Sequence, residues 1–237
     1  MRKGCIQASP FWRIRLDFGR QRLLPRNLAA TDAKRMIEQG WRQIDLSSSN
    51  PGGPRDPRFR SLRNLAILEV LFATGMRVGE LVSLTLADWR KEESSFLVMG
   101  KGLRQRIAIL PDERSQRAVR MYIDSRLRLS VDHEALFVNP RGKRISSQGI
   151  VRVIASTARA AGLGVRVTPH MIRHTVGTLL LRCGADIRVV QEVLGHASIV
   201  TTQRYTFVSQ DHIMSTLRTN HPNHQMKIQL PPPTGVI

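Results

Sequence analysis

The residues whose types suggest chemistry gather in one C-terminal stretch, residues 168–206, at the edges of apolar segments. His170 and Arg173 are three positions apart, His196 follows a glycine, and Tyr205 is one of only two tyrosines in the chain. Phosphodiester exchange without a metal needs a nucleophile, cations on the non-bridging oxygens, and groups that transfer protons. A phenol ionises at about pH 10, so a tyrosine nucleophile must be activated, and cations around a phosphate supply that activation. These residue types therefore suit phosphoryl transfer.

Two cations from earlier in the chain extend this set. Arg77 opens a helical run after a glycine break, and Lys101 lies between two glycines. The candidate catalytic residues are therefore Arg77, Lys101, His170, Arg173, His196 and Tyr205. Each of them alone is equally consistent with a surface, capping or core role.

Helix boundaries are expected to position the C-terminal part of the set. Thr168 can cap a helix, and Pro169 suits its first position. His170 then lies in the first turn with Arg173 on the same face, at the positive helix end that favours phosphate. Gly184 is expected to end this helix in a left-handed conformation.

A second helix is expected to follow at once. Asp186 can cap it, Val189, Val190, Val193 and Leu194 form its buried side, and Gly195 ends it immediately before His196. The two helices joined at Gly184 also fit a helix-turn-helix, in which Arg188 faces DNA.

The rest of the chain predicts a mainly α fold with one small antiparallel β element. Residues 96–99 and 107–110 read as a β-hairpin, with Lys101, Arg104 and Arg106 near its tip. The apolar run at residues 136–138 predicts a short extended segment. Helices are expected near residues 31–37, 61–73, 77–84, 111–128, 146–161 and 209–219.

Charge and composition indicate a nucleic-acid partner. The chain has 237 residues, with 37 basic and 18 acidic side chains and a net charge of +19. A folded chain this basic is most often bound to the phosphate backbone of nucleic acid. Cys5 and Cys183 are too few for a disulfide framework, which favours a reducing compartment. No apolar run is long enough for a membrane span, and no secretory signal is evident.

Metal chemistry is not expected. His221 and His224 have a loose metal-like spacing, but they lie in a polar tail with no cysteine partner, which argues against a zinc site. The acidic residues are scattered rather than clustered, which argues against a two-metal nuclease. We therefore expect no metal and no other cofactor.

Five separated motifs resemble the tyrosine recombinases, also called the phage integrase family, and most closely their Xer-like bacterial members. The motifs are ATGMRVGEL (73–81), MGKGLRQR (99–106), TPHMIRHT (168–175), VQEVLGHASIVTTQRYT (190–206) and HP (221–222). The resemblance covers roughly residues 24–222. It implies the tyrosine recombinase catalytic-domain fold, shared by DNA breaking-rejoining enzymes, and a site-specific recombinase or integrase that needs neither metal nor high-energy cofactor.

The resemblance implies a clamp on the scissile phosphate. Arg77 and Arg173 would bind its oxygens, and Glu80 would support the clamp without contacting the phosphate. The predicted DNA-binding residues are Arg104 and Arg106, near the hairpin tip, and Arg188, from the helix-turn-helix interpretation.

The resemblance also assigns the proton-transfer and nucleophilic roles. Tyr205 would attack phosphorus and form a 3′-phosphotyrosyl linkage, while His170 accepts the phenolic proton. Lys101 would protonate the 5′-hydroxyl leaving group, and His196 would hydrogen-bond a phosphate oxygen.

The expected domain organisation has three parts. Residues 1–23 would be a linker or arm remnant, residues 24–222 the catalytic domain, and residues 223–237 a disordered tail, with the family's N-terminal core-binding domain absent. The expected partners are double-stranded DNA, further copies of the chain in a tetramer on DNA, and another recombinase or accessory protein. The helix at 209–219 is expected to dock on a neighbouring subunit. The expected location is the bacterial cytoplasm, at the nucleoid.

Two alternatives remain open at this stage. The helix-turn-helix interpretation describes a non-catalytic DNA binder, such as a regulator or a decayed recombinase. The other keeps the chemistry but limits it to nicking and resealing, as in a type IB topoisomerase. The first alternative gives no role to Lys101, His196 and Tyr205, whereas the recombinase interpretation uses all three.

Overall fold

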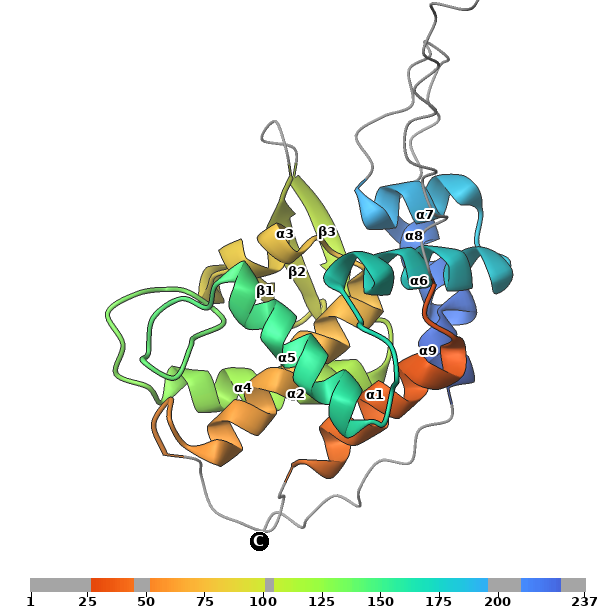
Figure 1. The fold of residues 1–237 in the computed structure, drawn as a ribbon. Coiled ribbons are helices and arrows are strands. Elements are labelled where there is room, and N and C mark those ends of the chain that lie inside the picture. Colours follow the sequence, from red (N-terminus) through yellow and green to blue (C-terminus); the bar gives the residue numbers. More distant parts are fainter. Residues whose placement is uncertain (1–26, 45–51, 101–104, 196–209, 227–237) are drawn as a thin grey trace, which may run out of the picture.

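The computed structural model describes residues 27–44, 52–100, 105–195 and 210–226, which form a mainly helical protein with one small antiparallel sheet (Figure 1). The elements are α1 (Ala30–Arg42), α2 (Pro57–Thr74), α3 (Val78–Ser83), the 3-10 turn η1 (Leu86–Asp88), β1 (Trp89–Arg90), β2 (Ser95–Met99), β3 (Gln105–Ile109), α4 (Glu113–Leu127), α5 (Ser147–Ala160), α6 (Pro169–Arg182), α7 (Ile187–Leu194), α8 (Gln210–Asn220) and α9 (Pro222–Gln225). This confirms the fold class expected from the sequence.

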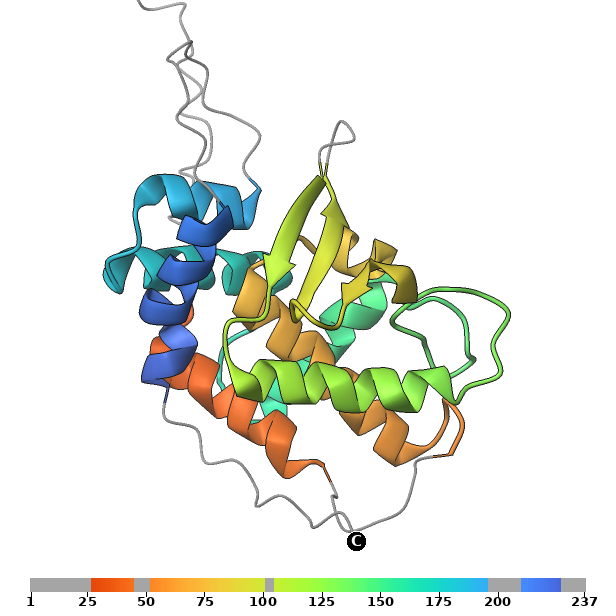
Figure 2. The same cartoon turned by 180° about the vertical axis from the view of Figure 1, so that it is seen from behind.

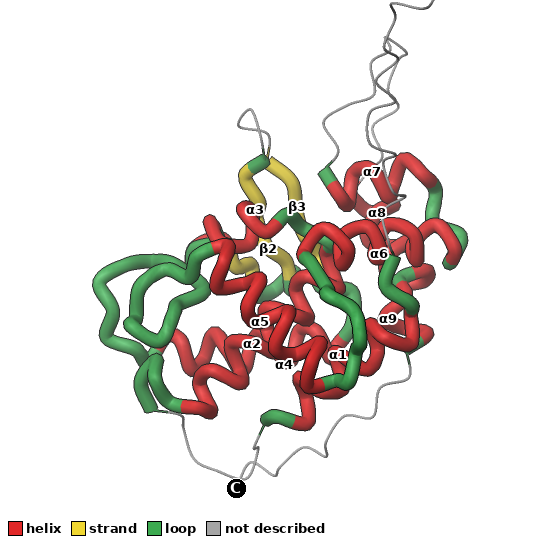
Figure 3. Tube along the Cα trace, in the orientation of Figure 1, coloured by secondary structure: helices red, strands yellow, loops and turns green. Residues whose placement is uncertain are grey.

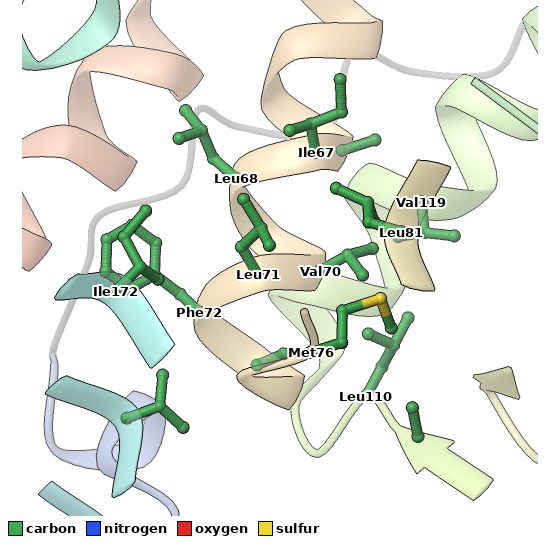
Figure 4. Packing of buried hydrophobic residues seen from close by; sticks show 14 of the residues in the cluster. Ile67, Leu68, Val70, Leu71, Phe72, Met76, Leu81, Leu110, Val119 and Ile172 are labelled. Carbon is green, nitrogen blue, oxygen red and sulfur yellow. The ribbon is translucent and has the colours of Figure 1, made fainter. Parts of the chain in front are cut away.

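Helix α2 is the centre of the core. Asp56 caps it by accepting a hydrogen bond from Arg58 N, and Pro57 takes its first position. Thirteen of its 18 residues are buried, because α1, α4, α5 and α6 pack around it. Figure 4 shows its side chains among those of neighbouring elements, with Ile172 of α6 beside Phe72. The helix ends at Gly75, whose φ of 58° is left-handed, as expected.

The sheet has the order β1–β2–β3 and is antiparallel throughout. Its strands are coloured yellow in Figure 3. Phe96 pairs with Ala108, and Val98 pairs with Arg106. Paired residues share one face of a sheet, and positions two apart along a strand also share it. Phe96, Val98 and Ala108 are buried, so Arg106 begins on the inward face. The short strand β1 was not predicted.

The connection between α4 and α5 projects on the side of the molecule opposite α7 and α8 (Figures 1 and 2). Buried Arg126 holds it by donating to the carbonyls of His133 (2.8 Å) and Ala135 (3.0 Å). The extended piece predicted at 136–138 is instead a bend between two isolated bridges, at Ala135 and Val138.

A buried ionic group joins α1, α2 and α4. Glu69 is fully buried and accepts hydrogen bonds from Trp41 Nε1 (2.7 Å) and from Arg114 Nε (2.9 Å) and Nη2 (3.2 Å). Burial raises the pKa of the Glu69 carboxyl, and the Arg114 guanidinium opposes that rise. Three helices that are distant in sequence are thereby fixed around one carboxylate.

The expected boundaries of α6 and α7 are present. Thr168 caps α6 by accepting from Met171 N (3.2 Å), and Asp186 caps α7 by accepting from Arg188 N (2.7 Å). Gly184 and Gly195 follow these helices with φ of 87° and 65°. Local capping rules therefore fixed both helices correctly.

The C-terminal segment differs from its prediction, because residues 223–226 are folded. His221 caps α9, and its Nε2 lies 2.9 Å from Ala73 O. Asn223 Nδ2 donates to Asp112 Oδ2 (2.7 Å), and Met226 joins the core. The prediction of a disordered tail is therefore wrong for these four residues. The remainder, 227–237, and the predicted arm at 1–23 lie outside the described residues.

Helix α8 packs against α7 of its own chain, with Ile213 and Leu217 buried. The apolar face that was expected to meet a neighbouring subunit is covered within the chain here. None of the helices in the described ranges is long and apolar enough to cross a membrane.

Candidate active site

Arg77 lies at the start of α3, where Glu80 fixes its orientation. The Glu80 carboxylate accepts from the Arg77 backbone N–H (2.9 Å) and from Arg77 Nη1 (2.8 Å). The side chain of Arg77 is 45% exposed, so its guanidinium remains accessible to an anion. The other amino group, Nη2, donates to Gly195 O (2.9 Å).

Arg173 approaches the same place from α6, but it is buried. Its Nη1 donates to Gly75 O (2.8 Å), and its Nη2 donates to Leu194 O. Burial, followed by repulsion from Arg77, lowers the pKa of Arg173 to about 10. The guanidinium therefore stays charged at neutral pH in surroundings where an anionic ligand would be favourable.

Arg106 lies in β3 close to the hairpin connection, as expected, but its side chain faces inward. It was expected near the hairpin tip as a DNA-binding residue, but its side chain is 9% exposed and turned inward from β3. Its Nη2 donates to Glu80 Oε2 (2.8 Å), and its Nη1 donates to Val193 O (2.9 Å). The structure thus removes Arg106 from the exposed cations and places it behind Arg77.

Glu80 is the carboxylate that Arg77 and Arg106 share, and its charge also acts on Arg173. Its burial acts to raise the pKa, but attraction to Arg106 and the hydrogen bonds from Arg77 and Arg106 prevail and lower it. Three guanidinium groups around one carboxylate leave an excess of two positive charges, which suits a phosphate diester.

The three arginines bind the last carbonyls of α7. Arg106 holds Val193 O, Arg173 holds Leu194 O, and Arg77 holds Gly195 O. The final carbonyls of a helix have no partner within the helix and form the negative end of its dipole. Arginines from the start of α3, from β3 and from α6 therefore fix the backbone immediately before residue 196.

Close packing at glycines fixes the same junction. A Cβ added to Gly75 would lie 2.6 Å from Leu194 Cδ2, and one added to Gly177 would lie 3.0 Å from Leu194 Cδ1. At Gly195 a Cβ would lie 2.8 Å from Arg106 Nε. The end of α7 is thus held through its backbone and through the Leu194 side chain.

The remaining candidates fall into two groups. His170 is exposed in the first turn of α6, one turn before Arg173, and Arg188 is exposed in the first turn of α7. Lys101, Arg104, His196 and Tyr205 lie outside the described residues. The structure therefore brings Arg77, Arg173 and Glu80 together and leaves the roles of the other candidates as predictions.

Sequence reasoning missed the contribution of Arg106 and of the α7 carbonyls. The sequence held only a weak signal for Arg106: it alternates with Ala108, but Ile107 and Ile109 on the other face of the strand are equally apolar, so the pattern alone does not show which face is buried. Among the described residues, no three His, Cys, Asp or Glu side chains are grouped to bind a metal ion.

Comparison with known proteins reveals relatives across most of the chain. Tyrosine recombinase XerC of Thermodesulfovibrio yellowstonii is 35% identical over 225 residues, covering 93% of this chain and 70% of the relative. Tyrosine recombinase XerC of Corynebacterium glutamicum is 42% identical over 161 residues, covering 68% of this chain and 52% of the relative. The chain thus corresponds to part of each longer protein.

Solved structures have the same fold. The crystal structure of XerA recombinase matches with a TM-score of 0.64 and 36% identity, covering 86% of this chain and 66% of that one. The XerH site-specific recombinase, in a pre-cleavage complex with its difH substrate, matches with a TM-score of 0.61 and 26% identity, covering 74% of this chain and 48% of that one. Residues 55–212 match the model of the phage integrase family, and with these relatives they establish that the chain belongs to that family, the tyrosine recombinases.

Proposed function

We propose that this chain is a site-specific DNA recombinase that cuts and rejoins strands through a 3′-phosphotyrosyl intermediate at Tyr205. The observation that carries the proposal is the meeting of Arg77 and Arg173, from α3 and α6, around the residue that leads into the His196–Tyr205 segment. Two guanidinium groups at one point suit the two non-bridging oxygens of a phosphodiester.

The proposed step is an in-line exchange at phosphorus. The Tyr205 oxygen forms a bond to phosphorus as the bond to the 5′ oxygen breaks. His170 takes the phenolic proton, and Lys101 gives a proton to the departing 5′ oxygen. Arg77, Arg173 and His196 stabilise the charge on the non-bridging oxygens.

Reversal of this step joins strands. The 5′-hydroxyl of a partner strand attacks the phosphotyrosine and releases the phenol, so the number of phosphodiester bonds is conserved. The proposed chemistry consumes no nucleotide and needs no metal or other cofactor.

Duplex DNA and further copies of the chain are the proposed partners. The net charge of +19 favours a polyanion, and the relative XerH was captured with its difH substrate. Exchanging both strands of two duplexes requires four cleavages, and each chain supplies one Tyr205, so the working assembly is a tetramer on DNA. Another recombinase or an accessory protein is a further candidate partner. The proposed location is the bacterial cytoplasm, at the nucleoid.

A covalent-adduct experiment tests the function. The protein is incubated with a pool of nicked duplexes whose central sequence is randomised, so that a cleaved strand loses a short 5′-hydroxyl fragment and religation fails. We expect an adduct that survives denaturing electrophoresis and enriches one sequence. DNA binding without any adduct would instead favour the non-catalytic DNA binder.

The second tyrosine provides a matched control. Tyr205→Phe should abolish the adduct. Tyr122 is buried, and its hydroxyl donates to Leu136 O (2.9 Å). Tyr122→Phe should therefore cost about 1 kcal/mol of stability through the lost hydrogen bond and retain the adduct. Equal adduct from Tyr205→Phe and wild type would refute the assigned nucleophile.

A further inference from the structure

Arg106 connects two parts of the candidate site from a buried position, behind the exposed Arg77, which also contacts both Glu80 and the end of α7. The guanidinium of Arg106 bridges the Glu80 carboxylate, which orients Arg77, and the carbonyl of Val193 in the last turn of α7. The first contact acts on the phosphate clamp. The second acts on the helix end that leads into the segment with His196 and Tyr205.

The position of Arg106 argues against direct contact with DNA. The side chain is 9% exposed, and its guanidinium is already paired with the Glu80 carboxylate, whereas the similarly buried Arg173 donates to two uncharged carbonyls. The N–H on Nε of Arg106 is buried and has no hydrogen-bond partner among the described residues. That group faces Gly195, where an added Cβ would lie 2.8 Å away. The contacts of Arg106 therefore position other groups of the protein, namely Glu80 and the last turn of α7.

We infer that Arg106 is a positioning residue for strand cleavage: through Glu80 it orients Arg77, and through Val193 O it fixes the start of the segment that bears the nucleophile. This inference rests on the proposed function. It requires a planar fork, because one end of the side chain must meet a carboxylate at 2.8 Å and a carbonyl at 2.9 Å. An ammonium group at this position can keep the ion pair, but it loses the fork that bridges both acceptors.

The expected consequence is a loss of reaction rate without a matching loss of DNA affinity. Small displacements of a positioned group reduce rates by up to about 100-fold, because the reacting atoms no longer start from a near-attack geometry. The affinity for DNA comes mainly from exposed cationic side chains that contact the phosphate backbone, and Arg106 is not exposed.

The test compares Arg106→Lys with Arg126→Lys in the full chain. Arg126 is also buried and also holds two backbone carbonyls, but it does so in the connection on the far side of the molecule. The DNA is the nicked duplex enriched from the randomised pool. The measurements are the cleavage rate at saturating DNA, the dissociation constant for the same duplex, the melting temperature, and amide hydrogen exchange across residues 187–195.

Arg106→Lys should slow cleavage at saturating DNA by about 10- to 100-fold and change the dissociation constant by less than about threefold. Hydrogen exchange in the last turn of α7 should be about tenfold faster, because a charge-assisted contact to Val193 O is lost. Arg126→Lys should lower the melting temperature at least as much and leave cleavage and exchange in α7 near wild type. Equal cleavage rates in the two variants would overturn the inference.

Failure of the proposed function is distinguishable from failure of this inference. If wild type forms no adduct with any duplex of the pool, the proposed function fails. The structural part of the inference is then decided by hydrogen exchange: faster exchange of residues 193–195 in Arg106→Lys than in Arg126→Lys supports it, and equal exchange overturns it.

Discussion

Because His221 is buried, we expect the contacts that hold the C-terminal residues 221–226 to the core to weaken as the pH falls. The Nε2 of His221 meets Ala73 O, which can only accept a hydrogen bond, and its Nδ1 accepts from the Asn223 backbone N–H (3.2 Å). These contacts fix the neutral ring with its proton on Nε2. Burial lowers the pKa of His221 from 6.5 to about 4, although the Asp112 carboxylate opposes this.

The difference between the folded and unfolded pKa values of His221 gives the sign and the size of the stability loss. The unfolded chain takes up a proton at His221 near pH 6.5, whereas the folded chain does so only near pH 4, so stability is complete above pH 6.5 and declines between these values. The full loss is about 2.5 pKa units, or about 3.4 kcal/mol, and about 2 kcal/mol of it is already lost at pH 5.

Urea unfolding at pH 7.5 and pH 5.0, followed by circular dichroism, measures this loss. The comparison variant is His221→Gln, which keeps a donor for Ala73 O and does not titrate. We expect the unfolding free energy of wild type to fall by about 2 kcal/mol more than that of the variant, while other groups cancel in the difference. Parallel pH dependences, or an NMR titration of His221 with a pKa near 6.5, would refute the reasoning.

Three further predictions concern the junction, the core and DNA binding. Gly195→Ala should cost about 1–2 kcal/mol of stability in urea unfolding, because φ is +65° and the new Cβ would meet Arg106; a cost equal to that of Gly53→Ala, where nothing lies within 4 Å, would contradict this. Arg114→Met should cost about 3–5 kcal/mol at pH 7.5, since it leaves the Glu69 charge buried without its partner, and a cost below about 1 kcal/mol would refute the ionic account. The affinity for duplex DNA should fall at least tenfold between 50 and 200 mM salt, as binding isotherms would show, because many cations contact phosphate; a salt-independent affinity would contradict a backbone-binding surface.

Much of the helical framework could be predicted because its signals are local. Thr168 and Asp186 correctly predicted where two helices begin, because each caps its helix through a hydrogen bond to a nearby backbone N–H. Gly75 and Gly195 correctly predicted where helices end, because each adopts a left-handed backbone conformation there. These rules depend only on neighbours in sequence, so no knowledge of the tertiary fold was needed.

The errors arose where distant segments decide the outcome. Arg106 was correctly placed near the hairpin tip but wrongly expected to bind DNA there, because the inward face of β3 depends on its register with β2. The folded residues 223–226 were assigned to a tail, although Asn223 contacts Asp112, 111 positions earlier. A polar sequence that contains proline is predicted to be disordered from its composition, even where a distant residue such as Asp112 accepts a hydrogen bond from it in the folded protein.

The anchored C-terminal helices also bear on the segment that carries the proposed nucleophile. Tyr205 lies ten positions after Gly195 and five before Gln210, the first residue of α8. Five residues of fully extended chain span at most about 18 Å, so the shorter covalent connection runs to the C-terminal helices. Since α8 packs on α7 and His221 anchors α9, the described chain that follows Tyr205 is attached to the folded core, as is the end of α7 that precedes it. Loss of the His221 contact would therefore loosen one of the two attachments between which the proposed nucleophile lies in sequence, so it bears on the proposed chemistry as well as on stability.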